Sequence, residues 1–145
     1  MNAQEMFKRL DGLLENSRVG ILTSVDERGY PRSRWMTPIL LPGREGCIYA
    51  LTSPAFRKVV EITKHPMVEW IFQTRSLDEI LTVLGKVEFI DNPSLKSEVQ
   101  EALGTNLTVF WKVNPNESSL VVVETRVEEF NLFLPMRNER HRVEL

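Results

Sequence analysis

The chain contains, from residue 20, the stretch Gly20-Ile21-Leu22-Thr23-Ser24-Val25-Asp26-Glu27-Arg28-Gly29-Tyr30-Pro31-Arg32-Ser33-Arg34-Trp35-Met36. Residues 19–25 are rich in side chains that favour β-strands, and residues 30–41 form a second such run. Between them, residues 26–29 are typical of a tight turn, with Gly29 where a positive φ is needed. We therefore predict an antiparallel hairpin, which argues against a doubly wound parallel sheet.

The second predicted strand, residues 30–41, has two different faces because successive side chains of a strand point to opposite sides. One face carries Arg32, Arg34 and Met36, and the other carries Ser33, Trp35, Thr37 and Ile39. Pro31 and Pro38 have no backbone N–H to donate to a neighbouring strand. They therefore place this strand at an edge of the sheet or at bulges.

The remaining chain predicts further short strands and helices. We expect helices over 3–15 and 54–64 and a third helix between a cap at 91–94 and Gly104, with strands over 47–51, 67–72, 77–90 and 118–133. Gly85 indicates a bulge or a point of close approach. Residues 105–113 fit either a helix turn or a strand, and the charged tail 135–145 is expected to be mobile. These elements predict a single domain over 1–145, mainly β (α+β), as an antiparallel barrel with short helices packed outside.

The composition is that of an ordinary globular protein: 145 residues, 42% hydrophobic and 26% charged. A net charge of −2 argues against sequence-independent binding of nucleic acid, which needs a basic face. Cys47 is the single cysteine and His65 and His141 are the two histidines, which argues against a disulfide or a cysteine- or histidine-based metal site. With neither a signal peptide nor an apolar run of the roughly 20 residues that a membrane span needs, we expect a cytoplasmic protein.

A second stretch has the properties of an anion site: Leu51-Thr52-Ser53-Pro54-Ala55-Phe56-Arg57-Lys58. Ser53 is a good helix N-cap, and Pro54 suits the first helical position. Arg57 and Lys58 are unfavourable at the start of a helix, because cations near a helix N-terminus oppose its dipole at a cost of roughly 0.3–1 kcal/mol each. Free N–H groups, two hydroxyls and two cations suit a phosphate. The residues alone leave open the alternative that both cations point into solvent.

Three stretches in this order resemble the pyridoxamine 5′-phosphate oxidase-like FMN-binding split-barrel family, and in particular its general stress protein 26-like branch. They are residues 20–25 with 29–36, residues 51–58 running on to 65–68, and residues 84–88. Together they span residues 19–90, a little over half of the chain. The resemblance implies a split antiparallel β-barrel with peripheral helices, and a homodimer that binds FMN at the subunit interface.

The resemblance also implies which residues hold FMN. Arg34 would reach the phosphate, with the backbone of Trp35, Met36 and Thr37 near the isoalloxazine ring. Leu51 and Thr52, followed by Ser53, would flank the phosphate and the ribityl chain, and Arg57 with Lys58 would clamp the phosphate. From their place in the chain, Trp111 or Phe110 would contribute to the second subunit's site; the alternative for Trp111 is a core or dimer-interface aromatic.

Several positions depart from the family pattern. Ile39 stands where tight FMN binders often carry lysine, Phe56 replaces a serine, and Ile80 stands where the oxidase has a glutamine. Residues 115–145 lack the oxidase's block for pyridoxine phosphate, which argues against true pyridoxamine-phosphate oxidase activity. Losing one charge-assisted contact costs about 1.5–3 kcal/mol, so the flavin is expected to bind weakly.

Three hypotheses follow. The first is an FMN-dependent oxidoreductase acting on an unknown small-molecule redox substrate, in which no side chain stands out as a catalytic acid or base. The second is a non-enzymatic or stress-related protein that holds a flavin, F420 or haem. The third is a dimerisation module that has lost its cofactor, for which Ile39 and Phe56 are the best support. None of the three involves nucleic acid or a membrane.

Overall fold

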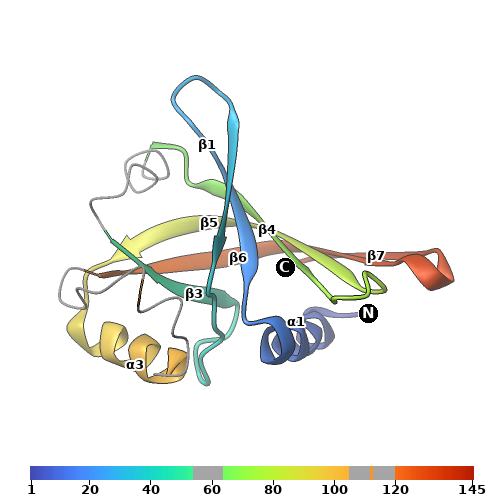
Figure 1. The fold of residues 1–145 in the computed structure, drawn as a ribbon, viewed down its shortest axis with the longest axis horizontal. Helices are drawn as coiled ribbons and strands as arrows, with labels where there is room; N and C mark the ends of the chain where they lie inside the picture. The colour runs from blue at the N-terminus through green and yellow to red at the C-terminus, as the bar shows by residue number, and fades with distance from the viewer. Residues whose placement is uncertain (54–63, 105–111, 113–119) are drawn as a thin grey trace.

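A computed structural model describes residues 1–53, 64–104, 112 and 120–145 (Figure 1). The elements are α1 (Ala3–Ser17), β1 (Gly20–Val25), β2 (Pro31–Met36), β3 (Cys47–Thr52), β4 (Met67–Gln73), β5 (Ile80–Ile90), α3 (Pro93–Leu103), β6 (Val121–Leu134), the 3-10 helix η2 (Pro135–Arg137) and β7 (Glu139–Glu144). The helix predicted over 54–64, except its last residue, and the ambiguous segment 105–113, except residue 112, lie outside the described residues. Within the described part, no helix is long and apolar enough to cross a membrane.

The strands form one antiparallel sheet in the order β2-β1-β4-β5-β6-β3, with β7 beside β6. Among the described residues, the segment after β2 meets β3 at one isolated bridge, between Ile39 and Tyr49. Two backbone hydrogen bonds of 2.7 and 2.9 Å form this bridge. In the described part of the chain, the sheet is thus a barrel joined at this bridge and open elsewhere between β2 and β3, which confirms the predicted split antiparallel barrel.

The two described α-helices cover different parts of the barrel (Figure 1). Helix α1 buries Met6, Leu10, Leu13 and Leu14 in the barrel core. Helix α3 packs Leu95, Val99 and Leu103 onto the other side of β3, against Cys47, Tyr49 and Leu51. Strand β3 is therefore buried along its whole length, because it has the barrel interior on one face and α3 on the other.

The barrel interior is organised around Trp70 on β4, which is fully buried. Its ring stacks on Phe72, with centroids 5.7 Å apart. Its Nε1–H donates a hydrogen bond of 3.0 Å to the buried Thr125 hydroxyl on β6. Gly20 allows this packing, because a Cβ atom there would lie 2.5 Å from the Phe72 ring. Val68, Trp70 and Phe72 share the buried face of β4, as the alternating pattern predicts.

Gly85 confirms the predicted irregularity in β5. The register between β5 and β6 shifts between Leu84 and Gly85. A Cβ atom on Gly85 would lie 2.4 Å from the backbone oxygen of Arg126. The position is therefore both a bulge and a close approach of two backbones.

Two predicted strands are shorter than expected. Strand β2 ends at Met36 instead of residue 41, because Pro38 cannot donate a ladder hydrogen bond. The strand face that carries Ser33 and Trp35 therefore ends at Trp35, and Thr37 is buried. Strand β5 begins at Ile80 instead of residue 77.

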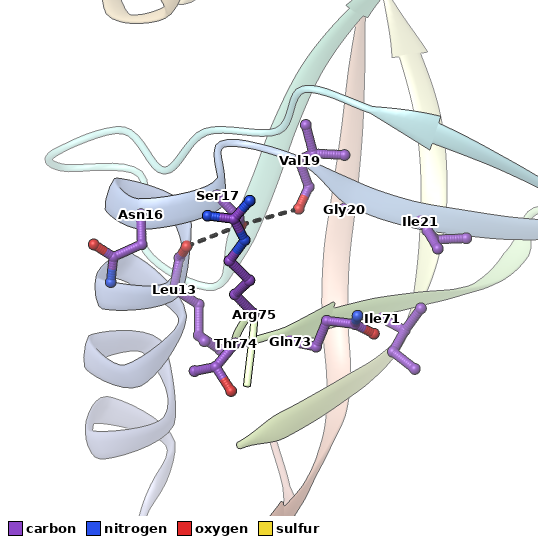
Figure 2. Close-up of a pocket in the computed structure, with 10 residues that line it drawn as sticks. All are labelled: Leu13, Asn16, Ser17, Val19, Gly20, Ile21, Ile71, Gln73, Thr74 and Arg75. Atoms are coloured by element: carbon purple, nitrogen blue, oxygen red, sulfur yellow. Dashed lines mark hydrogen bonds between the residues drawn. The ribbon is translucent and has the colours of Figure 1, made fainter. Parts of the chain in front are cut away.

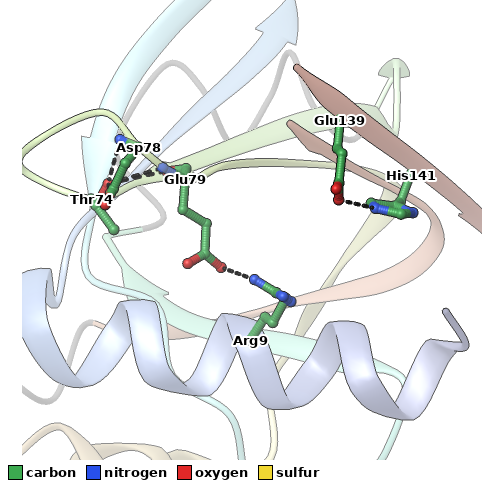
Figure 3. A network of polar contacts seen from close by, with 6 residues as sticks. All are labelled: Arg9, Thr74, Asp78, Glu79, Glu139 and His141. Atoms are coloured by element: carbon green, nitrogen blue, oxygen red, sulfur yellow. Dashed lines mark hydrogen bonds and ion pairs between the residues drawn. The ribbon is translucent and has the colours of Figure 1, made fainter. Parts of the chain in front are cut away.

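The residues before β5 form a tight polar turn (Figure 3). The Thr74 hydroxyl accepts hydrogen bonds from the backbone N–H groups of Asp78 and Glu79 and donates to the Asp78 carboxylate. Leu77 takes a left-handed conformation, with φ of 61°. Glu79 then pairs with Arg9 of α1 at 3.2 Å, so the turn is fastened to the helix.

The prediction of a mobile tail is wrong. Residues Glu139–Glu144 form β7, which pairs with Glu129–Leu134 of β6. The turn η2 reverses the chain, with Asn138 in the left-handed region at φ of 50°. Charged side chains can occupy this edge strand because Glu139, Arg142 and Glu144 lie in solvent, where Glu139 pairs with His141 (Figure 3).

Candidate cofactor site

The split between β2 and β3 brings most of the predicted cofactor residues to one end of the barrel. Because the bridge Ile39–Tyr49 is antiparallel, the residues before Ile39 lie beside those after Tyr49. Seven of the ten predicted residues therefore flank the same end of the split, and they are Arg34, Trp35, Met36, Thr37, Leu51, Thr52 and Ser53. Arg57, Lys58 and Trp111 lie outside the described residues.

Strand β2 offers different groups on its two faces and along its edge. Arg34 is half-buried, and its Nη1 donates a hydrogen bond of 3.3 Å to the backbone oxygen of Leu22. Met36 points into the core, whereas Trp35 lies on the opposite face and is 48% exposed. On the split side β2 has no strand partner in the described ranges, so alternate backbone N–H and C=O groups face the split.

The hydroxyls of Thr37 and Thr52 are the polar atoms of this region that indicate a ligand site. Their side chains are 5% and 1% exposed, and neither Oγ1 has a hydrogen-bond partner among residues 1–53, 64–104, 112 and 120–145. A buried hydroxyl without a partner costs about 1–3 kcal/mol. Two such hydroxyls at the same end of the split indicate a site that a polar ligand completes.

Ser24 is a residue that the sequence analysis missed. It is 1% exposed, and its Oγ likewise lacks a hydrogen-bond partner within the described part of the chain. The β1–β2 register places it opposite Arg32, next to the Leu22–Arg34 pair. The sequence indicates on which face Ser24 lies, because Leu22 and Ser24 are two residues apart in the predicted strand 19–25 and therefore share one face.

Asp26 balances the charge at the turn of the hairpin. Its buried carboxylate accepts hydrogen bonds from the backbone N–H groups of Arg28 (2.9 Å) and Tyr30 (3.0 Å) and lies 3.9 Å from the Arg32 guanidinium. Burial raises the pKa of Asp26, but the hydrogen bonds from Tyr30 and Arg28 outweigh it and leave the pKa below its ordinary value of 3.8. Asp26 is therefore ionised at neutral pH and offsets part of the charge of Arg28 and Arg32.

Ile39 and Ile80 are two positions that depart from the family pattern, and each is part of the packed fold. Ile39 is half-buried against the apolar cluster beneath α3. Ile80 begins β5, where it pairs with Gln73 and Phe133 in the interior of the sheet order. Neither position adds a charge to the split.

The chemistry available at the described part of the split is that of anion binding. The hydroxyls of Thr37 and Thr52 and the Arg34 guanidinium can donate to phosphate oxygens. Among the described residues, no group of three or more His, Cys, Asp or Glu side chains is arranged to hold a metal ion.

Comparisons with known proteins agree with this fold. A family model described as pyridoxamine 5′-phosphate oxidase matches residues 6–133. A comparison with curated proteins finds no match. One similar solved structure is a protein from Clostridium acetobutylicum related to general stress protein 26, with a TM-score of 0.75 and 16% identity over 100% of this chain and 97% of that one.

Two further structures carry ligand names in their descriptions. An FMN-binding protein related to pyridoxamine 5′-phosphate oxidase, from Nostoc punctiforme, aligns with a TM-score of 0.69 and 12% identity over 95% of each chain. A haem-binding protein from Mycobacterium smegmatis aligns with a TM-score of 0.71 and 15% identity over 96% of this chain and 57% of that one. At these identities the likeness shows a shared fold.

The chain is a split-barrel protein, and the match over residues 6–133 shows that it belongs to the pyridoxamine 5′-phosphate oxidase family. This confirms the resemblance found in the sequence. Relatives with this fold include proteins related to general stress protein 26.

Proposed function

We propose that this protein binds FMN across the split between β2 and β3 and acts in the cytoplasm as a flavin-dependent oxidoreductase on a small molecule. The observation that carries the proposal is the pair of buried hydroxyls of Thr37 and Thr52, which have no hydrogen-bond partner among the described residues. They lie at the end of the split where Arg34 supplies a positive charge. Hydroxyl and guanidinium donors match the acceptor oxygens of a phosphate ester.

In this proposal Arg34, Thr37, Thr52 and Ser53 would hold the phosphate and ribityl chain together with Arg57 and Lys58. The free edge of β2 at Trp35 and Met36 would offer backbone groups to the isoalloxazine ring, and Leu51 would pack beside the ribityl chain. Bound FMN supplies hydride or single-electron transfer. The chain's own contribution is to bind and orient the cofactor and to exclude water from its buried end.

A homodimer is part of the proposal, with Trp111 contributing to the second subunit's site. Four large apolar side chains are exposed on the outer face of four strands: Val25 on β1, Trp35 on β2, Met67 on β4 and Leu84 on β5. A second copy presenting the same face would bury them. We expect a dimer mass in light scattering, and a monomer mass for Met67→Glu combined with Leu84→Glu. A monomeric parent protein would contradict this part of the proposal.

Titration with FMN tests the cofactor assignment. Arg57→Ala combined with Lys58→Ala should weaken quenching of flavin fluorescence at least about tenfold, because two charge-assisted contacts are lost. Arg44→Ala is the matched control, because Arg44 pairs with Glu98 on α3. Equal FMN affinity of the double variant and the parent protein would refute the phosphate assignment. An absorbance spectrum of the purified protein separates FMN from haem and F420.

A second candidate function is a protein that holds FMN without turnover. The half-buried Ile39 favours it, because this position has become part of the apolar cluster beneath α3 and adds no cation to the split. Oxidation of NADH or NADPH by the FMN-loaded protein separates the two functions. A rate above that of free FMN supports the enzyme, and a rate equal to it supports the non-enzymatic binder.

A further inference from the structure

Two cavities of about 590 Å³ each border helix α1. The first lies between the C-terminal end of α1 and strands β1 and β4 (Figure 2). Ile21 and Ile71 line it, and Ile21 pairs with Trp35 of β2. This first cavity therefore opens on the outer sheet face that a second subunit would cover in the proposed homodimer, and it is not an independent site.

The second cavity lies at the other end of α1, between the start of the helix, the turn at residues 41–46 and the start of β3. Cys47 begins β3 at this cavity, whereas Thr52 ends the strand at the proposed flavin site. Because a strand rises about 3.3 Å per residue, the two residues are roughly 16 Å apart. Among the described residues that line the second cavity, none belongs to the proposed flavin site or to the four exposed apolar side chains of the outer face.

The walls of the second cavity come from two separate apolar clusters. Phe7 and Leu40 pack against the barrel core, where the Phe7 ring meets Phe130 edge-on with centroids 4.8 Å apart. Leu41 and Cys47 belong to the cluster beneath α3. Burial raises the pKa of the Cys47 thiol, so this thiol is uncharged at neutral pH. The cavity is thus an apolar gap between two packed clusters, with a size in the range of small-molecule sites, about 300–1,000 Å³.

The rim of the second cavity carries two charged side chains, Arg44 and Glu45. The Arg44 guanidinium already has a partner, because its Nη2 and Nε lie 3.3 and 3.4 Å from one carboxylate oxygen of Glu98 on α3. Glu45 is exposed, and no ion pair joins it to another residue in the part of the chain that the structure describes. The cavity therefore combines apolar walls with one carboxylate that no cation of the described residues balances.

We propose that the second cavity binds a small organic cation that has an apolar body and one ammonium group. The apolar body would lie between Phe7, Leu40 and Leu41, which removes apolar surface from water. The ammonium group would donate a charge-assisted hydrogen bond to the Glu45 carboxylate. An anion is disfavoured at this rim, because Glu98 already neutralises Arg44. The site uses no residue of the proposed flavin site, so either proposal can fail without the other.

A matched pair of probes tests this proposal: 4-phenylbutan-1-amine and 4-phenylbutan-1-ol, which share an apolar body and differ in charge at neutral pH. Titration calorimetry measures their binding to the full chain. We expect the amine to bind about two- to fivefold more tightly than the alcohol, as for an exposed ion pair. Glu45→Gln should remove this difference and leave the affinity of the alcohol unchanged. Glu27→Gln is the matched control, because Glu27 carries an exposed carboxylate on the turn between β1 and β2.

A second variant tests the location. Ala3, the first residue of α1, lines the cavity, so the larger side chain of Ala3→Leu should weaken binding of the amine and the alcohol alike. Unchanged thermal unfolding of Glu45→Gln and Ala3→Leu would show that both variants are folded.

Four outcomes would overturn the proposal. Two concern the parent protein: failure of both probes to bind, and equal affinity for the amine and the alcohol. The third is equal affinity of the amine for the parent protein and for Glu45→Gln. The fourth is displacement of the amine by saturating FMN, because the probe would then occupy the flavin site.

Discussion

Thr125 and Thr52 are buried threonines on the same β-ladder, yet their hydroxyls differ in their partners. Strands β6 and β3 pair Thr125 with Ile48 and Val121 with Thr52. The Thr125 hydroxyl accepts the hydrogen bond of Trp70 at 3.0 Å. The Thr52 hydroxyl, four residues further along β3, has no partner in the described part of the structure, and neither has that of Thr37 across the split.

The difference separates the part of the barrel that maintains the fold from the part that is open to a ligand. In the interior, a buried donor and a buried acceptor satisfy each other, which fixes one arrangement of β4 and β6. At the split, two buried hydroxyls have no partner within the described residues, which carries a cost in stability. Such a cost is typical of sites that a ligand completes.

The largest expected effect on stability comes from removing Trp70, the aromatic ring of the barrel interior. Trp70→Ala should lower the free energy of unfolding by about 3–5 kcal/mol, because a fully buried ring leaves a cavity. Trp35→Ala is the matched change at the split, where the ring is 48% exposed, and its cost should be well below half of that value. Urea unfolding measures both. Equal costs would contradict the division between interior and split.

A smaller effect is expected at the bulge opposite β6. Gly85→Ala should destabilise the protein by about 1–3 kcal/mol, because the new Cβ would meet the Arg126 backbone oxygen at 2.4 Å. Gly12→Ala in α1 is the control, since nothing lies within 4 Å of its added Cβ, and it should stabilise the helix by about 0.5–1 kcal/mol. Thermal unfolding compares the two variants. Opposite signs are expected, and a neutral Gly85→Ala would show that the bulge is not tightly packed.

The smallest effect concerns acid stability at the hairpin turn. The folded state lowers the pKa of Asp26 below 3.8, so Asp26 stabilises the protein above that pH and this contribution is lost as the pH falls through the folded pKa. Below pH 3.8, the free energy of unfolding of Asp26→Asn should therefore depend less on pH than that of the parent protein. Urea midpoints between neutral pH and pH 3 measure it. A steeper dependence in the variant would contradict the direction of the shift.

Much of the fold followed from local sequence patterns. The alternation on β4, the turn at Gly29 and the irregularity at Gly85 each have a short-range cause, and each was predicted correctly. Strand β7 was missed because a charged edge strand has no apolar alternation. Its pairing depends on the turn at residues 135–138 and on the partner strand β6.

The site was predicted less completely than the fold. The resemblance named Thr37 and Thr52, but the lack of hydrogen-bond partners is a property of the folded chain and cannot be read from residue types. The sequence places Ser24 on the same strand face as Leu22, but the burial of its hydroxyl without a partner among the described residues is a property of the folded chain. The predicted contributions of Arg57, Lys58 and Trp111 remain predictions.

The most direct test of the account combines stability and FMN affinity in one set of variants. Thr37→Val with Thr52→Val should leave the melting temperature of the cofactor-free protein unchanged or higher, because no hydrogen bond is lost, and should weaken FMN binding at least about tenfold. Thr125→Val should do the reverse: it should lower the melting temperature, because it leaves Trp70 Nε1–H without its acceptor, and keep the FMN affinity of the folded protein. If the split variant melts lower and binds FMN as well as the parent protein, its threonines are structural and the central claim is wrong.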